Sequence, residues 1–192
     1  LDSNRYVPFN VLDFPRINEA VDMILTSINN NEKILVYGDY DVDGVTATTV
    51  LTDGLRKLGA EVIFHVPDRF SEGYGMNLEV IRGLDKENVK LIITCDCGIS
   101  NFDEIDLAKQ MGIKVVLTDH HTIGAELPNA DVVVNPKLLE EGHKARNISG
   151  CAMAYYVIKA LYNKLGREEE TDSCLDLVAL SLLADVVPLI DE

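Results

Sequence analysis

Three aspartates alternate with other residues directly after a short apolar run, at positions Asp39, Asp41 and Asp43. The run at 33–37 (KILVY) is typical of a buried strand and residues 45–58 have the pattern of a helix, so the aspartates occupy the turn between them. Side chains two residues apart in an extended segment point to the same side, which predicts that these carboxylates converge. Clustered carboxylates repel one another unless some are protonated or a cation neutralises them. We interpret the cluster as a cation site.

Two other protein classes use similar strings. A calcium-binding EF-hand loop also begins D-x-D-x-D-G, but it requires a bidentate glutamate at its twelfth position, where this chain has Val50. A phosphatase of the haloacid dehalogenase kind carries D-x-D after its first strand and uses the first aspartate, here Asp39, as a nucleophile. The residues exclude the first class and leave the second open.

Apolar runs of strand length alternate with helical patterns along the rest of the chain. Strands are predicted at 33–37, 61–66, 89–94, 114–118 and 132–134, and helices at 17–28, 45–58, 78–84, 103–111, 151–165 and 175–190. This alternation predicts an α/β fold with a parallel sheet and helices on both faces, closing with two C-terminal helices. In such sheets the ligand site lies beyond the carboxyl ends of the strands.

Acidic and imidazole groups follow two of the predicted strands. Asp96 comes after the strand at 89–94, and the strand at 114–118 is followed by Asp119, His120 and His121. Together with the aspartate turn, these groups are expected to converge on one site. Adjacent side chains diverge, so we expect one histidine to bind a cation and the other to contact substrate phosphate. The neighbouring aspartate is expected to orient an imidazole through its second nitrogen.

Two features near the end of the chain extend the expected site. Ser149 and Gly150 precede the apolar run 151–165, where the serine is expected to cap a helix and the glycine to allow close approach of an anion. Capping alone is an equally good interpretation. Asp185 lies in the almost wholly apolar run 175–190. Because a buried carboxylate without a partner is costly, we expect Asp185 to bind a cation.

The composition of the 192 residues, 47% hydrophobic and 26% charged, is typical of an ordinary globular domain. No apolar run is long enough to span a bilayer and no leader precedes the first helix, so we expect a cytoplasmic protein without membrane association. The few cysteines lie in apolar segments and are expected to be reduced core residues; they are Cys95, Cys97, Cys151 and Cys174. A zinc site at Cys95-x-Cys97 lacks a second pair of ligands. The net charge of −15 argues against a nucleic-acid partner unless metal ions meet the phosphate.

Five motifs occur in order along the chain: GDYDVDG (38–44), DCG (96–98), DHH (119–121), SG (149–150) and ADVVPL (184–189). In this order they resemble the DHH phosphoesterase superfamily. Within it, DYDVDGVTATT (39–49) and PDRF-EGYGMN (67–77) are similar to the RecJ family of single-strand-specific exonucleases. Five ordered motifs are far more specific than any one of them. The resemblance implies that residues 1–192 are the DHH domain and that the family's further, DHH-associated domain is absent.

The resemblance also implies a centre that holds two divalent cations, Mn²⁺ or Mg²⁺. Asp41 would bind one cation, and Asp96 would bridge the two. Related phosphodiesterases have a histidine where this chain has Tyr37, so either Asp39 or a water molecule would complete the ligands of the first cation. The ligands of the second cation would be Asp43, His120 and Asp185.

The implied reaction is hydrolysis of a phosphodiester bond with the help of both cations and without a covalent intermediate. The catalytic residues would be Asp96, His120 and His121, and the substrate contacts would be Arg69, His121, Ser149 and Gly150. The implied function is 5′-to-3′ exonuclease activity on single-stranded DNA in repair and recombination, with RNA or short oligonucleotides as further substrates and repair or replication proteins as partners. Two alternatives stay open: a phosphodiesterase of short oligonucleotides or cyclic dinucleotides, and a non-catalytic replication scaffold.

Overall fold

The computed structural model describes residues 9–167 and 170–189 of the chain. Within these residues, five strands form one parallel sheet in the order β2-β1-β3-β4-β5. The strands are β1 (Lys33–Tyr37), β2 (Val62–His65), β3 (Val89–Thr94), β4 (Lys114–Thr118) and β5 (Val132–Val134). All five occur where the apolar runs predict them, so the predicted parallel sheet is confirmed.

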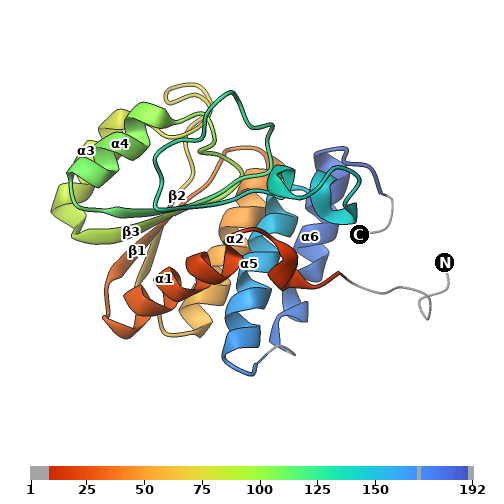
Figure 1. Cartoon of the computed structure of the whole chain (residues 1–192). Helices are drawn as coiled ribbons and strands as arrows, with labels where there is room; N and C mark the ends of the chain where they lie inside the picture. Colours follow the sequence, from red (N-terminus) through yellow and green to blue (C-terminus); the bar gives the residue numbers. More distant parts are fainter. Residues whose placement is uncertain (1–8, 168–169, 190–192) are drawn as a thin grey trace.

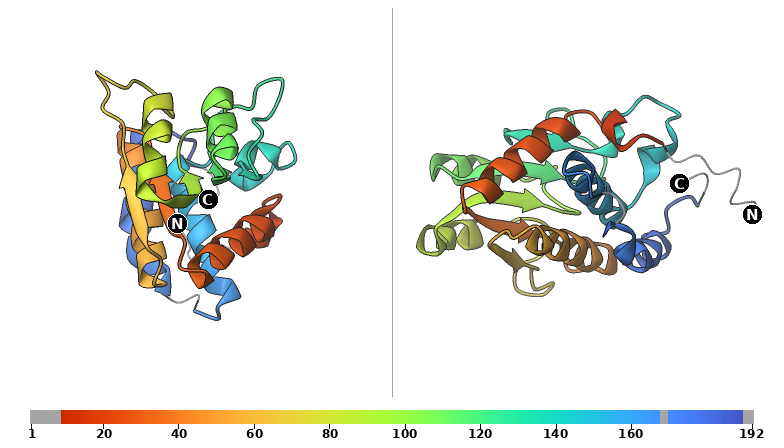
Figure 2. Two further views of the ribbon diagram at one scale, coloured as in Figure 1. Left: turned by 90° about the vertical axis from the view of Figure 1, so that its left-hand side faces the viewer. Right: turned by 90° about the horizontal axis from the view of Figure 1, so that it is seen from below.

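Helices cover both faces of this sheet (Figure 1). They are α1 (Ile17–Asn29), α2 (Val42–Lys57), α3 (Leu78–Gly83), α4 (Phe102–Gln110), α5 (Gly150–Lys164) and α6 (Leu175–Ala184). Helices α3 and α4 lie on one face and α1, α2 and α5 on the other, and α6 packs against α2 and α5 (Figure 2). The prediction of an α/β fold that closes with two C-terminal helices is confirmed.

The strands are apolar along their length because both faces of the sheet are covered. Alternate residues of β1 point to opposite faces. Ile34 and Val36 pack in the core formed with α1, α2 and α5, whereas Leu35 and Tyr37 pack in the core formed with α3 and α4. Two cores therefore hold the central strands, and the loops that leave the carboxyl ends of these strands start from fixed positions.

The start of α2 differs from the prediction and bears on the site. The helix begins at Val42, three residues before the predicted start, because the Asp41 carboxylate caps it by accepting a hydrogen bond from the Gly44 amide at 2.9 Å. Asp43 therefore lies in the first turn of the helix and not in an extended turn. The aspartates consequently point in different directions, and their convergence has a different geometry from the one predicted.

Helix α6 is shorter than predicted. It ends at Ala184, and Asp185 is its C-cap residue. The next residue, Val186, has a left-handed φ of 54°, which leads the chain out of the helix. The predicted helix end, Ile190, lies outside the described residues.

All four cysteines are free thiols, as predicted. Cys95, Cys97 and Cys151 are buried, and Cys174 is partly buried. Among the described residues, the groups that could hold a metal ion contain only aspartate and histidine, so the cysteine pair does not form a zinc site there. In the same part of the chain, no helix has the length and apolar character needed to cross a membrane.

Candidate metal centre

The candidate metal centre lies at the carboxyl-terminal edge of the sheet. Asp39, Asp96 and His120 follow β1, β3 and β4, respectively, each by two residues. These strands are neighbours in a parallel sheet, so their equivalent ends bring the three side chains close together. The convergence predicted from the strand pattern is confirmed.

Asp39, Asp41 and Asp96 form the first group of potential ligands. One carboxylate oxygen from each lies within 4.8 Å of the others. Asp39 and Asp96 are each only 2% exposed, and the Oδ1 atom of each has no hydrogen-bond partner among the described residues. Burial raises the pKa of Asp39, and it raises the pKa of Asp96 to about 7. Because a buried carboxylate with an unpartnered oxygen is costly, this group is suited to hold a cation.

Asp43, His120 and Asp185 form the second group, again with ligand atoms within 4.8 Å of one another. The Nδ1 atom of His120 lies 3.0 Å from the carbonyl oxygen of Ile148 and donates to it, so Nε2 of the neutral ring is free to act as a ligand. Nε2 is 3.0 Å from Asp96 Oδ1 without the alignment of a hydrogen bond, and it has no hydrogen-bond partner in the described chain. His120 thus connects the two groups.

The N-terminus of α5 holds the carboxylate of Asp43. Oδ2 of this carboxylate accepts a hydrogen bond from the Gly150 amide and Oδ1 accepts one from the Cys151 amide, both at 2.7 Å. The Ser181 hydroxyl of α6 also donates to Oδ1, at 2.7 Å. The free amides and the dipole of a helix N-terminus stabilise a negative charge. Asp43 therefore fixes α2 against α5 and α6 as well as facing the centre.

This arrangement differs from the expectation that Ser149 and Gly150 contact substrate phosphate. The Gly150 amide is already engaged by Asp43, and Ser149 is buried, where its hydroxyl accepts a hydrogen bond from the Ala152 amide at 3.2 Å. The capping interpretation of this serine is confirmed. Packing requires the glycine, because a Cβ atom at position 150 would lie 2.6 Å from the Cβ atom of Asp96.

Asp119 is fully buried and orients His121, not His120. Its Oδ1 atom accepts a hydrogen bond from the Nδ1 atom of His121 at 2.8 Å, and its Oδ2 atom accepts one from the Ile99 amide. This contact raises the pKa of His121. Burial opposes ionisation of Asp119, but His121 and the surrounding amides hold the pKa of this carboxyl below its usual value. One atom each of Asp96, His120 and His121 also lies within 4.8 Å of the others, so both histidines face the same centre.

The loop between β2 and α3 carries the predicted substrate contact Arg69. Its guanidinium group lies 5.3 Å from the centre of the Tyr40 ring, next to the aspartate turn. Glu72 fastens this loop, because its carboxylate lies 2.8 Å from Nε2 of His65 and accepts a hydrogen bond from the Asp68 amide at 2.9 Å. The loop therefore holds a defined position beside the centre.

The sequence interpretation did not include Tyr74 or Ser181. The hydroxyl of Tyr74 lies 3.2 Å from Nδ1 of His121 and 3.5 Å from the carbonyl oxygen of Asp96. Ser181 contacts Asp43 from α6. The signal for Tyr74 was its place in a loop rich in turn-forming residues. A serine in an otherwise apolar helix carries no comparable signal.

Asp185 has the expected neighbours but not the expected burial. It is exposed, with 30% of its side chain accessible, because α6 ends just before it. Its Oδ2 atom still lies 3.8 Å from Nδ1 of His120. Partial burial raises the pKa of Asp185. The argument that this carboxylate needs a cation because it is buried therefore fails, although its place in the second ligand group agrees with the prediction.

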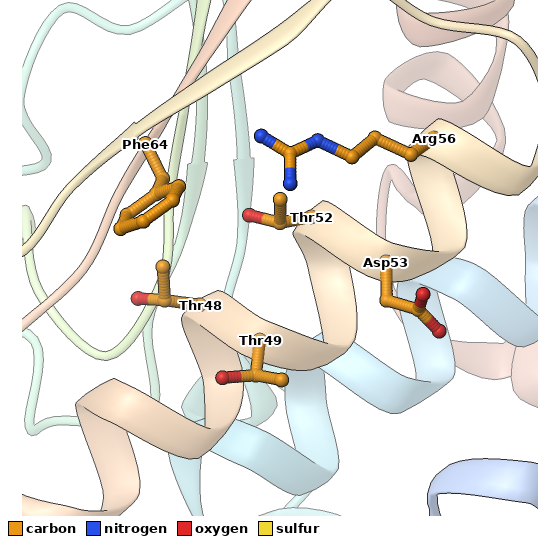
Figure 3. A pocket seen from close by; sticks show the side chains of 6 residues that line it. All are labelled: Thr48, Thr49, Thr52, Asp53, Arg56 and Phe64. Carbon is orange, nitrogen blue, oxygen red and sulfur yellow. The ribbon is translucent and has the colours of Figure 1, made fainter.

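A hollow of about 300 Å³ opens beside the second group, and we call it the histidine hollow. It is lined by His120, His121, Thr122, Lys137, Asn147, Ile148, Asp185, Val186, Val187 and Pro188. Another hollow, of about 290 Å³, lies on the outer side of α2 next to Phe64 and Arg56 (Figure 3). It contains no member of the ligand groups, whereas the histidine hollow is lined by His120, His121 and Asp185.

Comparison with known proteins identifies the family of this chain. A model of the DHH family, N-terminal domain, matches residues 33–182. The single-stranded-DNA-specific exonuclease RecJ of Bacillus subtilis is 41% identical over 191 residues, covering 100% of this chain and 23% of that protein. RecJ of Thermus thermophilus is 35% identical and covers 95% of this chain and 27% of that protein. The chain thus spans about a quarter of the length of these relatives.

Solved structures give the same result. A crystal structure of exonuclease RecJ bound to manganese has a TM-score of 0.85 and 35% identity, covering 95% of this chain and 46% of that chain. RecJ from Thermus thermophilus in complex with Mn²⁺ has a TM-score of 0.80 and 33% identity, covering 95% of this chain and 26% of that chain. The family model covers most of the chain, so the dehalogenase alternative at Asp39 no longer applies. The chain belongs to the DHH family.

Proposed function

We propose that this chain is the catalytic domain of an exonuclease that degrades single-stranded DNA in the 5′-to-3′ direction with the help of two divalent cations, Mn²⁺ or Mg²⁺. One observation carries the proposal. Three buried ligand atoms in the two groups have no hydrogen-bond partner among the described residues: Asp39 Oδ1, Asp96 Oδ1 and His120 Nε2. The relatives that contain this domain are named as single-strand-specific exonucleases, and two solved relatives hold manganese.

The donor set fits such cations. Carboxylate oxygens suit Mg²⁺ and Mn²⁺, and an imidazole nitrogen is a common ligand of transition metals. When bound, the two cations would neutralise charge on the phosphate and activate a water molecule for in-line displacement. The ligands of one cation would be Asp39, Asp41 and Asp96, and those of the other Asp43, His120 and Asp185, with Asp96 and His120 adjacent between them.

Protonation of His120 competes with its role as a ligand. Its Nδ1 atom donates to Ile148, so Nε2 must carry the lone pair that faces the centre. In the cation-free protein burial opposes a charged ring, but Asp96 and Asp43 raise the pKa of His120 to about 9. The ring therefore has to release a proton when Nε2 becomes a ligand, and cation binding is expected to weaken as the pH falls.

His121 and Arg69 are the proposed contacts to the substrate. Asp119 fixes the ring of His121 through Nδ1 and raises its pKa, which favours the charged imidazolium. A cationic ring held in this way is suited to donate a hydrogen bond from Nε2 to a phosphate oxygen. Arg69 would add a second positive charge from the loop beside Tyr40. In this scheme Asp96, His120 and His121 are the residues nearest the reacting phosphate.

The domain alone is proposed to hold a DNA strand weakly. Affinity for single strands comes from basic side chains that displace counterions and from aromatic rings that stack on bases. This chain has 17 basic residues against 32 acidic ones and no tryptophan. The relatives are several times longer than this chain. We propose that the parts of such proteins outside this domain carry the main strand-binding surface. The same parts would contact repair or replication proteins, in the cytoplasm.

The test uses single-stranded DNA labelled at either end, incubated with the protein and Mn²⁺. Nucleotides are expected to be released in order from the 5′ end, and chelation with EDTA should stop the reaction. The Asp96→Ala variant should form no product, whereas Asp103→Ala, which removes an exposed carboxylate on α4, should behave as wild type. Cleavage of dinucleotides alone would favour the short-oligonucleotide phosphodiesterase. Failure to bind Mn²⁺ and to cleave any strand would favour the scaffold.

A further inference from the structure

The histidine hollow has two walls of different character. His120, His121 and Asp185 form the wall that belongs to the metal centre. Lys137 and Asn147 line the hollow from two short 3₁₀ turns after β5, η4 (Pro136–Leu138) and η5 (Lys144–Asn147). A ligand in the hollow would therefore lie between the metal centre and these two polar side chains.

The ammonium group of Lys137 has only neutral hydrogen-bond partners. Its Nζ atom donates to the carbonyl oxygen of Arg146 and to Oδ1 of Asn147, both at 2.9 Å. Four other lysines of the described chain pair with carboxylates: Lys33, Lys57, Lys109 and Lys164. Lys137 has no such ion pair within the described residues, and an ammonium has three donors, so one N–H remains for a further acceptor.

Arg146 holds the backbone that carries this lysine. Its Nη1 atom donates to the carbonyl oxygens of Lys137 and Leu139, while Lys137 donates to the carbonyl of Arg146. The two turns therefore clamp each other, and the lysine is only partly exposed. A side chain that is already ordered loses little entropy when it binds a ligand.

Asn147 adds uncharged donors next to this charge. Because its Oδ1 atom accepts a hydrogen bond from Lys137, the side-chain NH₂ group carries two donors that no longer face the ammonium. Thr122 contributes a hydroxyl from the loop after β4. A positive charge with neutral donors beside it matches a phosphate group, although the lining of the hollow also includes the Asp185 carboxylate.

We propose that Lys137 binds a phosphate group of the substrate strand in the histidine hollow, with Asn147 as a neutral hydrogen-bond donor beside it. The proposal rests on the proposed function for its substrate. The phosphate would lie next to the bond that is cleaved, because the hollow shares His120 and Asp185 with the centre. Lys137 thus supplies a local positive charge in a chain whose net charge is −15.

The test compares Lys137→Gln, Lys137→Arg and Asn147→Asp with wild type. Hydrolysis of a labelled strand with Mn²⁺ gives kcat and KM at several salt concentrations, and equilibrium binding of the same strand with Ca²⁺ gives an affinity that does not depend on hydrolysis. Loss of one charged hydrogen bond should raise KM about tenfold or more in Lys137→Gln. The dependence of the logarithm of affinity on the logarithm of salt concentration should become shallower by about 0.7, as expected for one phosphate contact to a single strand.

Asn147→Asp separates binding from folding, because the carboxylate keeps the acceptor for Lys137 but neutralises its charge and repels phosphate. It should raise KM as Lys137→Gln does, while Lys137→Arg should recover part of the affinity. Lys90→Gln, at an exposed position near the start of β3, is the matched control and should behave as wild type.

Several outcomes would overturn the assignment. Wild-type KM and salt dependence in both Lys137→Gln and Asn147→Asp would show that the lysine only fastens η4 to η5. The same conclusion would follow if Lys137→Gln lost stability to urea but kept its salt dependence. If wild type binds the strand with Ca²⁺ without cleaving it, and Lys137→Gln loses this binding, the phosphate site stands and the proposed exonuclease function fails.

Discussion

Gly150 lies so close to Asp96 that a Cβ atom on Gly150 would be 2.6 Å from the Asp96 carboxylate and its Cβ atom. Replacement of a helical glycine by alanine normally stabilises a helix. Here the added methyl group would push Asp96 away from Asp39 and His120, its neighbours in the ligand groups. Gly150→Ala is therefore expected to weaken Mn²⁺ binding at least tenfold, about 1.4 kcal/mol, as measured by calorimetric titration.

Gly83→Ala is the control for this variant. Gly83 closes α3, and a Cβ atom there would meet no heavy atom within 4 Å. The substitution should leave Mn²⁺ affinity unchanged and stabilise the protein by up to about 1 kcal/mol. Equal Mn²⁺ affinity in Gly150→Ala and wild type would show that Asp96 does not need its observed position.

Asp43 and Asp96 are expected to differ in what they contribute to stability without cations. Asp43 accepts hydrogen bonds from two amides of α5 and from Ser181, so Asp43→Ala leaves the two buried amides without an acceptor, whereas the Ser181 hydroxyl keeps Ser149 as a partner. Its free energy of unfolding should fall by about 2 kcal/mol or more. Asp96 has an unpartnered oxygen and a pKa raised by burial, so Asp96→Ala should change this free energy by less than about 1 kcal/mol or increase it.

Urea unfolding in EDTA measures this difference, and both variants should lose Mn²⁺-dependent hydrolysis. A larger loss of stability in Asp96→Ala than in Asp43→Ala would contradict the assignment of Asp43 as the carboxylate that caps α5.

The cation-free protein should become less stable as the pH rises. Burial raises the pKa of Asp96 to about 7 and also raises the pKa values of Asp39 and Asp185. The folded protein therefore binds more protons than the unfolded chain, and the stability that these protons contribute is lost as the pH rises through the folded-state values. Urea midpoints in EDTA should fall from about pH 5 upward, and the His120 pKa of about 9 extends the fall to about pH 10.

The Asp96→Asn variant checks the origin of this effect, because it removes the most strongly shifted of the three carboxyl groups. Its midpoints should vary less over the same pH range. In wild type with saturating Mn²⁺ the dependence should reverse, since the cations bind the deprotonated groups. Urea midpoints that rise with pH in EDTA would mean that folding does not raise the pKa values of these carboxyl groups.

Glu72 is expected to contribute to substrate hydrolysis but not to the affinity for Mn²⁺. It fastens the loop that carries Arg69 and Tyr74 through His65 and the Asp68 amide. Glu72→Ala is expected to lower kcat/KM about tenfold, the effect of losing one charged hydrogen bond, while Mn²⁺ affinity stays as in wild type. Glu79→Ala, which breaks an exposed pair with Arg82 on α3, should leave kcat/KM unchanged. An equal decrease of kcat/KM in Glu72→Ala and Glu79→Ala would show that the contacts of Glu72 have no particular role in hydrolysis.

The sheet could be predicted because its strands are apolar on both faces and are separated by helical patterns. The same pattern placed Asp39, Asp96 and His120 at neighbouring strand ends. The start of α2 could not be predicted from the apolar pattern. The alternating aspartates suggest an extended segment, but the Asp41 side chain caps the helix. Local pattern thus identified which residues meet, but not how their carboxylates are directed.

Other parts of the centre depend on contacts between distant segments. Nothing in the sequence near Gly150 shows that its amide meets Asp43, and Ser181 lies in a helix that is otherwise apolar. Lys137 is one of several lysines in the chain, and its contacts with Arg146 and Asn147 hold it at the hollow. These roles are set by packing, and no short-range periodicity reveals them.

The hydrogen bond from Ser181 to Asp43 joins residues that are 138 positions apart. A ribosome makes the chain from its N-terminus, so the last strand, β5, is finished at Val134, well before Ser181 and Asp185 have been added. The second ligand group cannot close until α6 has left the exit tunnel and docked. The nascent chain therefore completes its sheet before its second ligand group, and the candidate metal centre can assemble only once residues as far as Asp185 have been made.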